Sequence, residues 1–168
     1  MGSHVSETPN SVQLRRLVDG FQISQALYVV ATLGIADLLA HGARTSHDLA
    51  EEANVQPEAL YRVLRALASV GVFHELDGDW FELTPLGTCL RSDAPEPIGA
   101  WAAYVGREYH WQAWAHLLDA VRTGEFAFKQ VHGQSGWDYR NDHPDERAIF
   151  VSFAGNSTLN HPYAVLPK

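Results

Sequence analysis

The sequence has little cysteine and no long apolar run. Its 168 residues include one cysteine, Cys89, which excludes an internal disulfide framework and any metal site built from several cysteines. No stretch approaches the roughly 20 apolar residues that a membrane-spanning helix needs, and we expect no signal peptide. The expected protein is therefore cytoplasmic and has no membrane partner. We expect Cys89 to be a small buried hydrophobe.

Basic residues are also scarce: 12 Lys and Arg stand against 20 Asp and Glu, and the formal net charge is −8. Residues 45–91 have the pattern of a winged helix-turn-helix, with Asp77-Gly78 as the hairpin signal for a two-stranded wing. Thr45-Ser46-His47-Asp48 has the capping pattern of a helix start, with Asp in place of the usual Glu. A DNA-binding winged helix needs a basic face, because neutralised phosphates supply most of its non-specific affinity. The presumed recognition helix, Pro57 to Val70, offers only Arg62 and Arg65. We therefore expect it to pack against protein, with no nucleic-acid partner.

Two apolar helices are predicted before the winged helix. Leu14, Leu17, Val18 and Phe21 recur at helical spacing and predict an amphipathic helix over about residues 12–21. The next helix, about residues 24–33, is apolar on all sides, which is typical of a helix buried all round. In a small domain such burial indicates a second subunit, so we expect a homodimer. The expected interface residues are Leu17, Phe21, Leu27, Tyr28 and Val30.

Aromatic residues crowd the chain after Arg91. Helices are predicted over residues 101–106, 111–122 and 144–154, and a loop over residues 129–136. Most large aromatic side chains in a protein of this size form core, but these exceed what a few short helices need for packing. Trp and Tyr suit the walls of pockets for flat ligands. The candidate ligand-binding residues are Trp101, Tyr104, Trp111, Phe128, Trp137, Tyr139 and Phe150.

Motifs that carry chemistry are few. No two of the nine histidines have a spacing that places two metal ligands on one helix face, so we expect no metal site. The sequence has no Gly-x-Gly-x-x-Gly and no Walker loop, so we expect no cofactor in this chain and predict no catalytic residue. Gly133-Gln134-Ser135-Gly136 resembles half of a nucleophile elbow but lacks its closing glycine.

Several short motifs follow one another in the order found in a known enzyme family. They are Leu33-Gly34-Ile35-Ala36-Asp37-Leu38-Leu39, Leu49-Ala50, Leu60-Tyr61-Arg62-Val63-Leu64-Arg65-Ala66-Leu67, Gly71-Val72-Phe73, Leu83-Thr84-Pro85-Leu86-Gly87, Trp114-Ala115-His116-Leu117-Leu118, Val121-Arg122-Thr123-Gly124-Glu125 and Trp137-Asp138-Tyr139. In this order the chain resembles the small-molecule O-methyltransferases that use S-adenosylmethionine. The resemblance covers nearly the whole chain.

The resemblance implies a mainly α fold, in which a winged helix-turn-helix with a two-stranded wing carries additional dimerisation and lid helices. In that family a C-terminal Rossmann-like part holds S-adenosylmethionine and the catalytic base, usually a histidine, and this sequence stops before such a part. Residues 1–11 are then expected to be disordered or tag-derived, 12–91 to form the dimerisation helices and winged-helix core, 92–154 the substrate lid and 155–168 a truncated connector.

The function implied is that of the dimerisation and substrate-capping domain of an O-methyltransferase acting on an aromatic natural product. The chain would be a fragment or truncated form, inactive alone, and S-adenosylmethionine is implied only for the complete parent enzyme. Two alternatives stay open. A standalone aromatic-ligand-binding protein or cofactor-free enzyme would bind polycyclic phenols without a methyl donor, and a winged-helix transcriptional regulator would bind DNA with a steep salt dependence.

Overall fold

The computed structural model describes residues 9–156, with side chains up to residue 152, and within this range the fold is mainly α as predicted. In chain order the elements are α1 (Asn10–Val18), α2 (Gly20–Thr32), α3 (Ile35–Leu38), β1 (Arg44–Thr45), α4 (Ser46–Glu52), α5 (Pro57–Ala68), β2 (Phe73–Leu76), β3 (Trp80–Leu83), α6 (Pro85–Thr88), α7 (Gly99–Val105), α8 (Glu108–Ala115), α9 (Leu117–Thr123), α10 (Ala127–His132), α11 (Gly136–Asp142) and α12 (Pro144–Asn156). The expectations for residues 1–8 and 157–168 lie outside the described residues.

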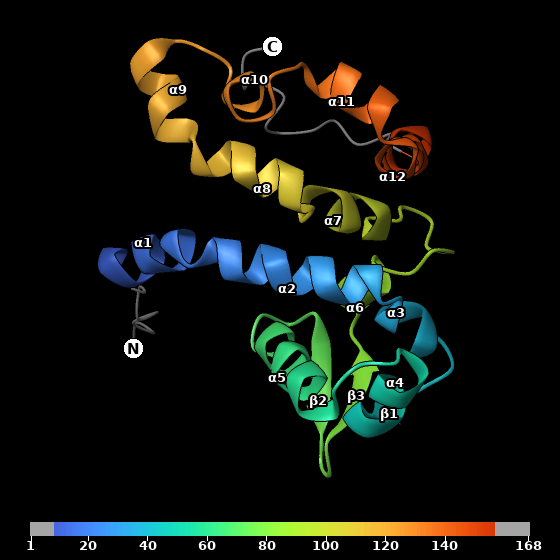
Figure 1. Ribbon diagram of the computed structural model, residues 1–168. Helices are drawn as coiled ribbons and strands as arrows, with labels where there is room; N and C mark the ends of the chain where they lie inside the picture. The colour runs from blue at the N-terminus through green and yellow to red at the C-terminus, as the bar shows by residue number, and fades with distance from the viewer. Residues whose placement is uncertain (1–8, 157–168) are drawn as a thin grey trace.

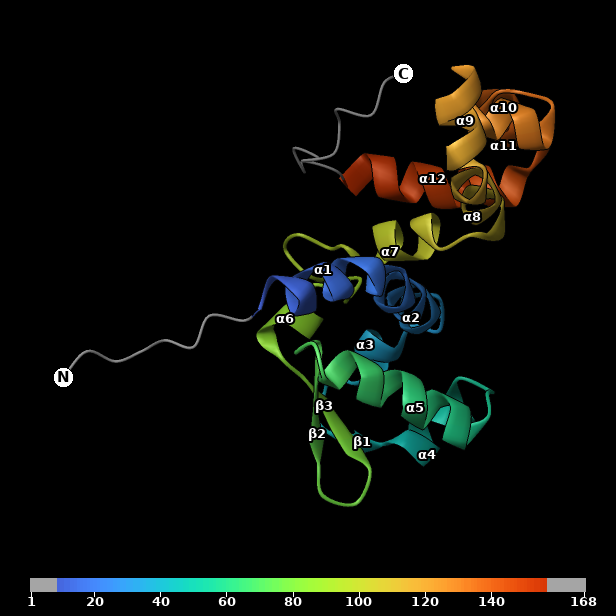
Figure 2. The same ribbon diagram turned by 90° about the vertical axis from the view of Figure 1, so that its left-hand side faces the viewer.

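The elements form three tiers, which Figures 1 and 2 show from two sides. The lower tier is the winged helix, α3 to β3, and the middle tier is formed by α1 and α2. The upper tier is formed by α7 to α12: α7 and α8 run along the other side of α2, and α9 to α12 lie above them (Figure 1). Helix α2 packs against α5 below and α7 above, so it joins the lower tier to the upper one.

The winged helix is confirmed, and local side-chain chemistry explains its boundaries. The hydroxyl of Thr45 accepts a hydrogen bond from the backbone N–H of Asp48 at 3.0 Å, which caps α4 as the sequence predicts. Strands β2 and β3 pair antiparallel around Gly78 (φ +74°). The sheet also has a strand that the sequence did not indicate, because β1 is only two residues long and pairs with β3 through Arg44 and Phe81. The fully buried centre of this tier is formed by Leu49, Leu64, Leu67, Phe73 and Phe81.

The presumed recognition helix, α5, is tied to the wing by one acidic residue. Glu75 on β2 accepts a hydrogen bond from the Tyr61 hydroxyl at 3.0 Å. The same carboxylate forms an ion pair with Arg65 at 3.7 Å. One of the two basic side chains predicted on this helix is therefore partly neutralised within the chain.

The N-terminal helices differ in two respects from the prediction. The first helix ends at Val18 rather than Phe21, and α2 begins at Gly20, a residue of low helix propensity that stands at the junction. Helix α2 is also not buried on all sides in one chain, since only Val30 is fully enclosed. Its remaining apolar side chains are half-covered by α5 and α7 or open to solvent.

The aromatic half contains more helix than predicted. The single helix expected over 111–122 is two helices, α8 and α9, which meet at His116. The loop expected over 129–136 is wrong, because α10 ends at Gly133 (φ +71°) and α11 begins after Ser135. The Ser135 hydroxyl accepts a hydrogen bond from the backbone N–H of Asp138 at 3.2 Å, so the half-elbow motif is a turn with a helix cap.

The contact between α2 and α7 depends on a glycine. A Cβ at Gly106 would overlap the side chain of Tyr28, whereas a Cβ at Gly20 would meet nothing within 4 Å. We predict that Gly106→Ala lowers the free energy of unfolding by about 1–3 kcal/mol, because the overlap forces the helices apart. Gly20→Ala, the matched control, should cost nothing in urea denaturation. Equal midpoints for the two variants would contradict this packing.

Candidate functional site

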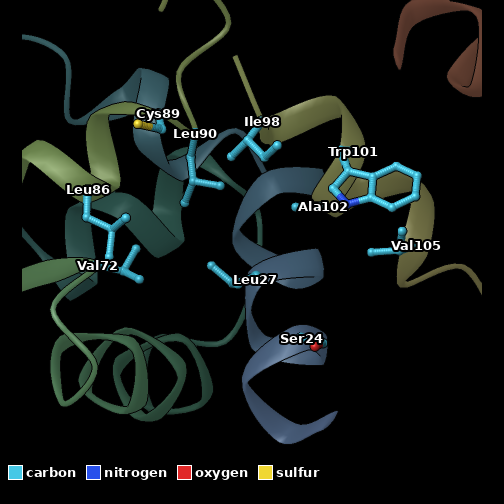
Figure 3. A pocket seen from close by; sticks show the side chains of 10 residues that line it. All are labelled: Ser24, Leu27, Val72, Leu86, Cys89, Leu90, Ile98, Trp101, Ala102 and Val105. Carbon is cyan, nitrogen blue, oxygen red and sulfur yellow. The ribbon is translucent and has the colours of Figure 1, made fainter. Parts of the chain in front are cut away.

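An apolar pocket of about 280 Å³ opens between α2, α6 and α7 (Figure 3). Leu27 on α2 points toward Val72 and Leu86, whereas Ser24 lies on the side of the helix where α7 places Trp101 and Val105. The Ser24 hydroxyl donates a hydrogen bond to the carbonyl of Gly20 at 3.2 Å, so it is already engaged. The pocket therefore offers mainly apolar contact.

Cys89 also lines this pocket and corrects one expectation. Its side chain is exposed rather than buried, because it follows the short helix α6 at the surface. The neighbouring Leu90 is the residue that enters the core at this point.

Most of the predicted ligand-binding aromatics come together in the upper tier. The rings of Tyr109 and Tyr139 stack at 4.9 Å, and the ring of Phe128 meets Tyr139 edge-on at 5.6 Å. Tyr104 lies 5.5 Å from Phe150, and the ring of Phe150 also meets Trp137 edge-on at 5.5 Å. Helices α7, α8, α10, α11 and α12 each supply at least one ring. We call this group the aromatic cluster: Tyr104, Tyr109, Phe128, Trp137, Tyr139 and Phe150.

Two predicted residues lie apart from the centre of the cluster. Trp101 is 5.7 Å from Tyr104, but it lines the apolar pocket. Trp111 packs edge-on against Phe21 at 6.3 Å and so joins α8 to the start of α2. The seven candidates thus occupy three places, and their role in ligand binding stays a prediction.

The sequence reasoning missed the polar centre of the cluster, Arg140. Its guanidinium carbon lies 4.7 Å from the centre of the Trp137 ring and 4.4 Å from that of Phe150. Nη1 donates a hydrogen bond to the Tyr104 hydroxyl at 3.2 Å. The available signal was spacing, since a residue three positions after Trp137 falls on the same helix face.

His110 and Tyr109 were also missed, and burial sets their protonation. Burial, with smaller contributions from the charges of Arg140 and His132, lowers the pKa of His110 to about 4. Burial is also the main cause that raises the pKa of Tyr109 and that of Tyr104. At neutral pH the imidazole is therefore uncharged, and both tyrosines keep their protons.

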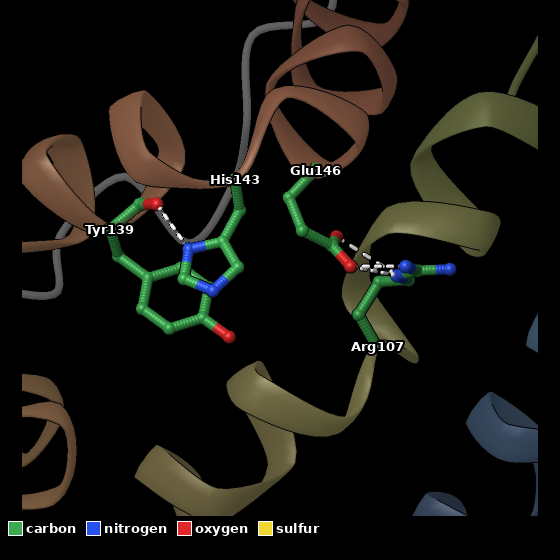
Figure 4. A network of polar contacts seen from close by, with 4 residues as sticks. All are labelled: Arg107, Tyr139, His143 and Glu146. Carbon is green, nitrogen blue, oxygen red and sulfur yellow. Dashed lines mark hydrogen bonds and ion pairs between the residues drawn. The ribbon is translucent and has the colours of Figure 1, made fainter.

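A second pocket, of about 360 Å³, has polar walls and borders the cluster at Tyr109 and Tyr139. Arg107, at the start of α8, forms a two-pronged ion pair with Glu146 on α12 (Figure 4). The ring of His143 stacks on Tyr139 at 4.0 Å, and its Nδ1 donates to the carbonyl of Tyr139 at 2.7 Å. These contacts fix α12 against α8.

The described residues hold no group of three or more His, Cys, Asp or Glu side chains that is placed to bind a metal ion. Between residues 9 and 156 no strand leads through a glycine-rich turn into a helix, the arrangement that holds a dinucleotide or a similar cofactor. These residues therefore do not fit S-adenosylmethionine. No helix in the same range is long and apolar enough to cross a membrane.

The residues predicted for a dimer interface differ in exposure. Leu17 is 78% exposed and Phe21 52%, whereas Leu27 and Tyr28 are half-buried. Val30 is 1% exposed within the core of its own chain, so it has no surface left for a partner. The other four remain interface predictions.

The buried His110 predicts acid sensitivity. Below pH 6.5 the unfolded chain binds a proton at His110, which the folded chain accepts only near pH 4. The free energy of unfolding should therefore fall by on the order of 3 kcal/mol as the pH drops across that window. His110→Phe should remove most of this slope in urea denaturation at a series of pH values. His116→Phe, at an exposed position, should keep it, and parallel slopes for the two variants would contradict the assignment.

Comparison with known proteins agrees with this architecture. Residues 15–93 match the O-methyltransferase dimerisation domain family. The chain is 37% identical over 158 residues to the phenazine O-methyltransferase PhzM of Lysobacter antibioticus, an alignment that covers 94% of this chain and 46% of that protein.

Solved structures agree as well. The crystal structure of LaPhzM matches with a TM-score of 0.82 and 39% identity, over 88% of this chain and 45% of the other. NcsB1, an O-methyltransferase from neocarzinostatin biosynthesis solved with S-adenosylmethionine and 2-hydroxy-5-methyl naphthoic acid, matches with a TM-score of 0.69 and 31% identity, over 79% and 41%.

The chain spans less than half the length of these relatives. Over that part the fold corresponds, with a TM-score of 0.82 for LaPhzM. The chain therefore belongs to the O-methyltransferase family through its dimerisation domain, residues 15–93.

Proposed function

We propose that this chain forms the homodimer and covers the aromatic substrate in an O-methyltransferase of natural-product biosynthesis. The observation that carries the proposal is the aromatic cluster, which five helices assemble above a dimerisation domain. A domain that served dimerisation alone would not need aromatic rings from five helices, two of which lie against a buried cation. The cluster supplies what a flat ligand needs: broad apolar walls with a few polar groups.

The substrate class follows from the rings and from the relatives. PhzM is named for phenazine, and NcsB1 was solved with a naphthoic acid, so both involve fused planar rings. Trp137 is 66% exposed although it touches Phe150 and Arg140, so its ring offers a free face. A planar fused-ring compound laid on Trp137 would bury that face.

The methyl donor proposed for the whole protein is S-adenosylmethionine, which one of the relatives binds. The described residues do not form a site for it, so this chain contributes substrate contact and enclosure. Positioning is itself a large part of catalysis by such enzymes, because oriented reactants react far faster than free ones.

Dimerisation is supported by the apolar row on the N-terminal helices. Leu14, Leu17, Val18 and Phe21 are all exposed and recur at helical spacing, and a contiguous patch of this kind marks an interaction surface. Helix α1, which carries three of these residues, lies at one end of the middle tier, away from the turn between β2 and β3 (Figure 1). A second copy of the chain is the proposed partner.

We predict that Leu17→Glu converts a dimer into monomers, because the interface would have to bury an unpaired charge. The molar mass measured by light scattering after gel filtration should halve. Trp80→Gln is the matched control, since Trp80 is an exposed apolar residue on the wing. A dimer mass retained by Leu17→Glu would place the interface elsewhere.

We also predict that Trp137→Ala weakens the binding of 2-hydroxynaphthalene by about 5- to 30-fold, the loss expected when one aromatic wall is removed. Equilibrium dialysis without any methyl donor measures this affinity. Trp114→Ala, an exposed tryptophan outside the cluster, should bind as the unaltered chain does. An unchanged affinity in Trp137→Ala would contradict the proposed site, and conversion of the ligand without a donor would favour a cofactor-free enzyme.

A further inference from the structure

We infer that Arg140 selects for substrates that carry a carboxylate on the planar ring system, by binding that carboxylate inside the aromatic cluster. The inference rests on the proposed function and narrows its substrate class. It concerns a residue at the centre of the cluster, where the side chains of Tyr104, Trp137 and Phe150 meet one guanidinium.

Arg140 is a buried cation without an acid. Arg140 is 9% exposed, and no carboxylate among residues 9–152 forms an ion pair with it. The nearby acid Glu146 is engaged by Arg107, and Asp138 accepts from the Ser135 hydroxyl at 2.7 Å. Buried charges in proteins are normally paired, because an unpaired one loses its hydration without compensation.

The neighbouring tyrosines and histidine do not supply the missing negative charge. Burial raises the pKa of Tyr104 and Tyr109, so neither becomes a tyrosinate near neutral pH. Burial and the charge of Arg140 lower the pKa of His110, so the imidazole is neutral there. The net charge of the cluster centre is therefore that of one guanidinium.

The rings compensate Arg140 only in part. Cation–π contact with Trp137 and Phe150 stabilises the charge but satisfies none of its N–H groups. Nη1 has one partner, the Tyr104 hydroxyl, and Nε is buried with no acceptor among the described residues. His110 Nε2, on the adjacent helix α8, is likewise buried with no partner there.

A carboxylate would complete this arrangement. A planar guanidinium with free N–H groups matches the two oxygens of a carboxylate, which it binds with geometric specificity. The same ligand would need a flat apolar body, because the walls beside the cation are the rings of Trp137 and Phe150. One aromatic acid would therefore satisfy the charge, the unpaired N–H groups and the exposed ring face together.

The test compares 2-naphthoate with 2-naphthamide, two ligands of the same shape of which only the first is charged. Equilibrium dialysis of the 168-residue chain should give about tenfold tighter binding of naphthoate, as for a hydrogen-bonded charge. Arg140→Leu should abolish that preference without weakening naphthamide. Arg147→Leu, which removes the same charge from an exposed position on α12, should retain it.

Two further arms keep the test decisive. If circular dichroism shows that Arg140→Leu is unfolded, Arg140→Gln takes its place, because glutamine keeps a long polar side chain but carries no charge. Arg140→Gln must then lose the preference for naphthoate over naphthamide. Acetate should compete poorly with naphthoate, because it lacks the ring. Competition by acetate at equal concentration would indicate a site for any small anion and would overturn the aromatic-acid assignment.

The outcomes distinguish carboxylate binding by Arg140 from aromatic substrate binding by the cluster. Equal binding of naphthoate and naphthamide, unchanged in Arg140→Leu, would overturn the role of Arg140 and leave the aromatic substrate site intact. Binding of neither compound at millimolar concentration would overturn both. A naphthoate preference that Arg147→Leu also loses would assign the effect to overall charge and not to Arg140.

Discussion

Helix α2 contacts the winged helix on one side and α7 on the other, and the close approach of α7 depends on Gly106 lying against Tyr28. Close-packed interiors leave no room for an added methyl group at such a point. The helices that carry the aromatic cluster start from α7, so the packing of α7 on α2 positions them above the dimerisation domain. Tyr28 also lines the polar pocket, and α2 therefore positions the cluster as well as supporting it.

The upper tier is held by side-chain pairs more than by a continuous apolar core. The Arg107–Glu146 ion pair fixes α12 to α8, and the ring of Tyr139 stacks between Tyr109 and His143. Arg140 joins α11 to α7 through the Tyr104 hydroxyl. A tier held in this way can present polar groups to a ligand, because its polar side chains lie between the helices.

Sequence reasoning predicted the elements whose signals are local. The Asp77-Gly78 turn and the Thr45 cap each depend on residues within four positions, and both lie where expected. Strand β1 was missed because its two residues are defined by their pairing with β3, far along the chain. Helices α10 and α11 were missed because the two glycines around Ser135 were interpreted as a loop, whereas they separate two short helices.

The candidate site shows the same difference between features with a local sequence signal and features that depend on long-range packing. Aromatic composition indicated which rings matter, and Tyr104, Phe128, Trp137, Tyr139 and Phe150 do come together. Arg140 was missed because an arginine in a helix is usually solvated, and its spacing from Trp137 does not predict burial against α7 and α12.

The contacts of Glu75 change the charge of the surface between the wing and α5. Glu75 occupies the space between the wing and the helix that, in a nucleic-acid reader, would face a phosphate, and it holds both Tyr61 and Arg65. A polyanion that approached this face would meet an arginine whose charge Glu75 partly offsets. The winged helix therefore supports the helices above it through α2, while one acid ties its presumed recognition helix to the wing.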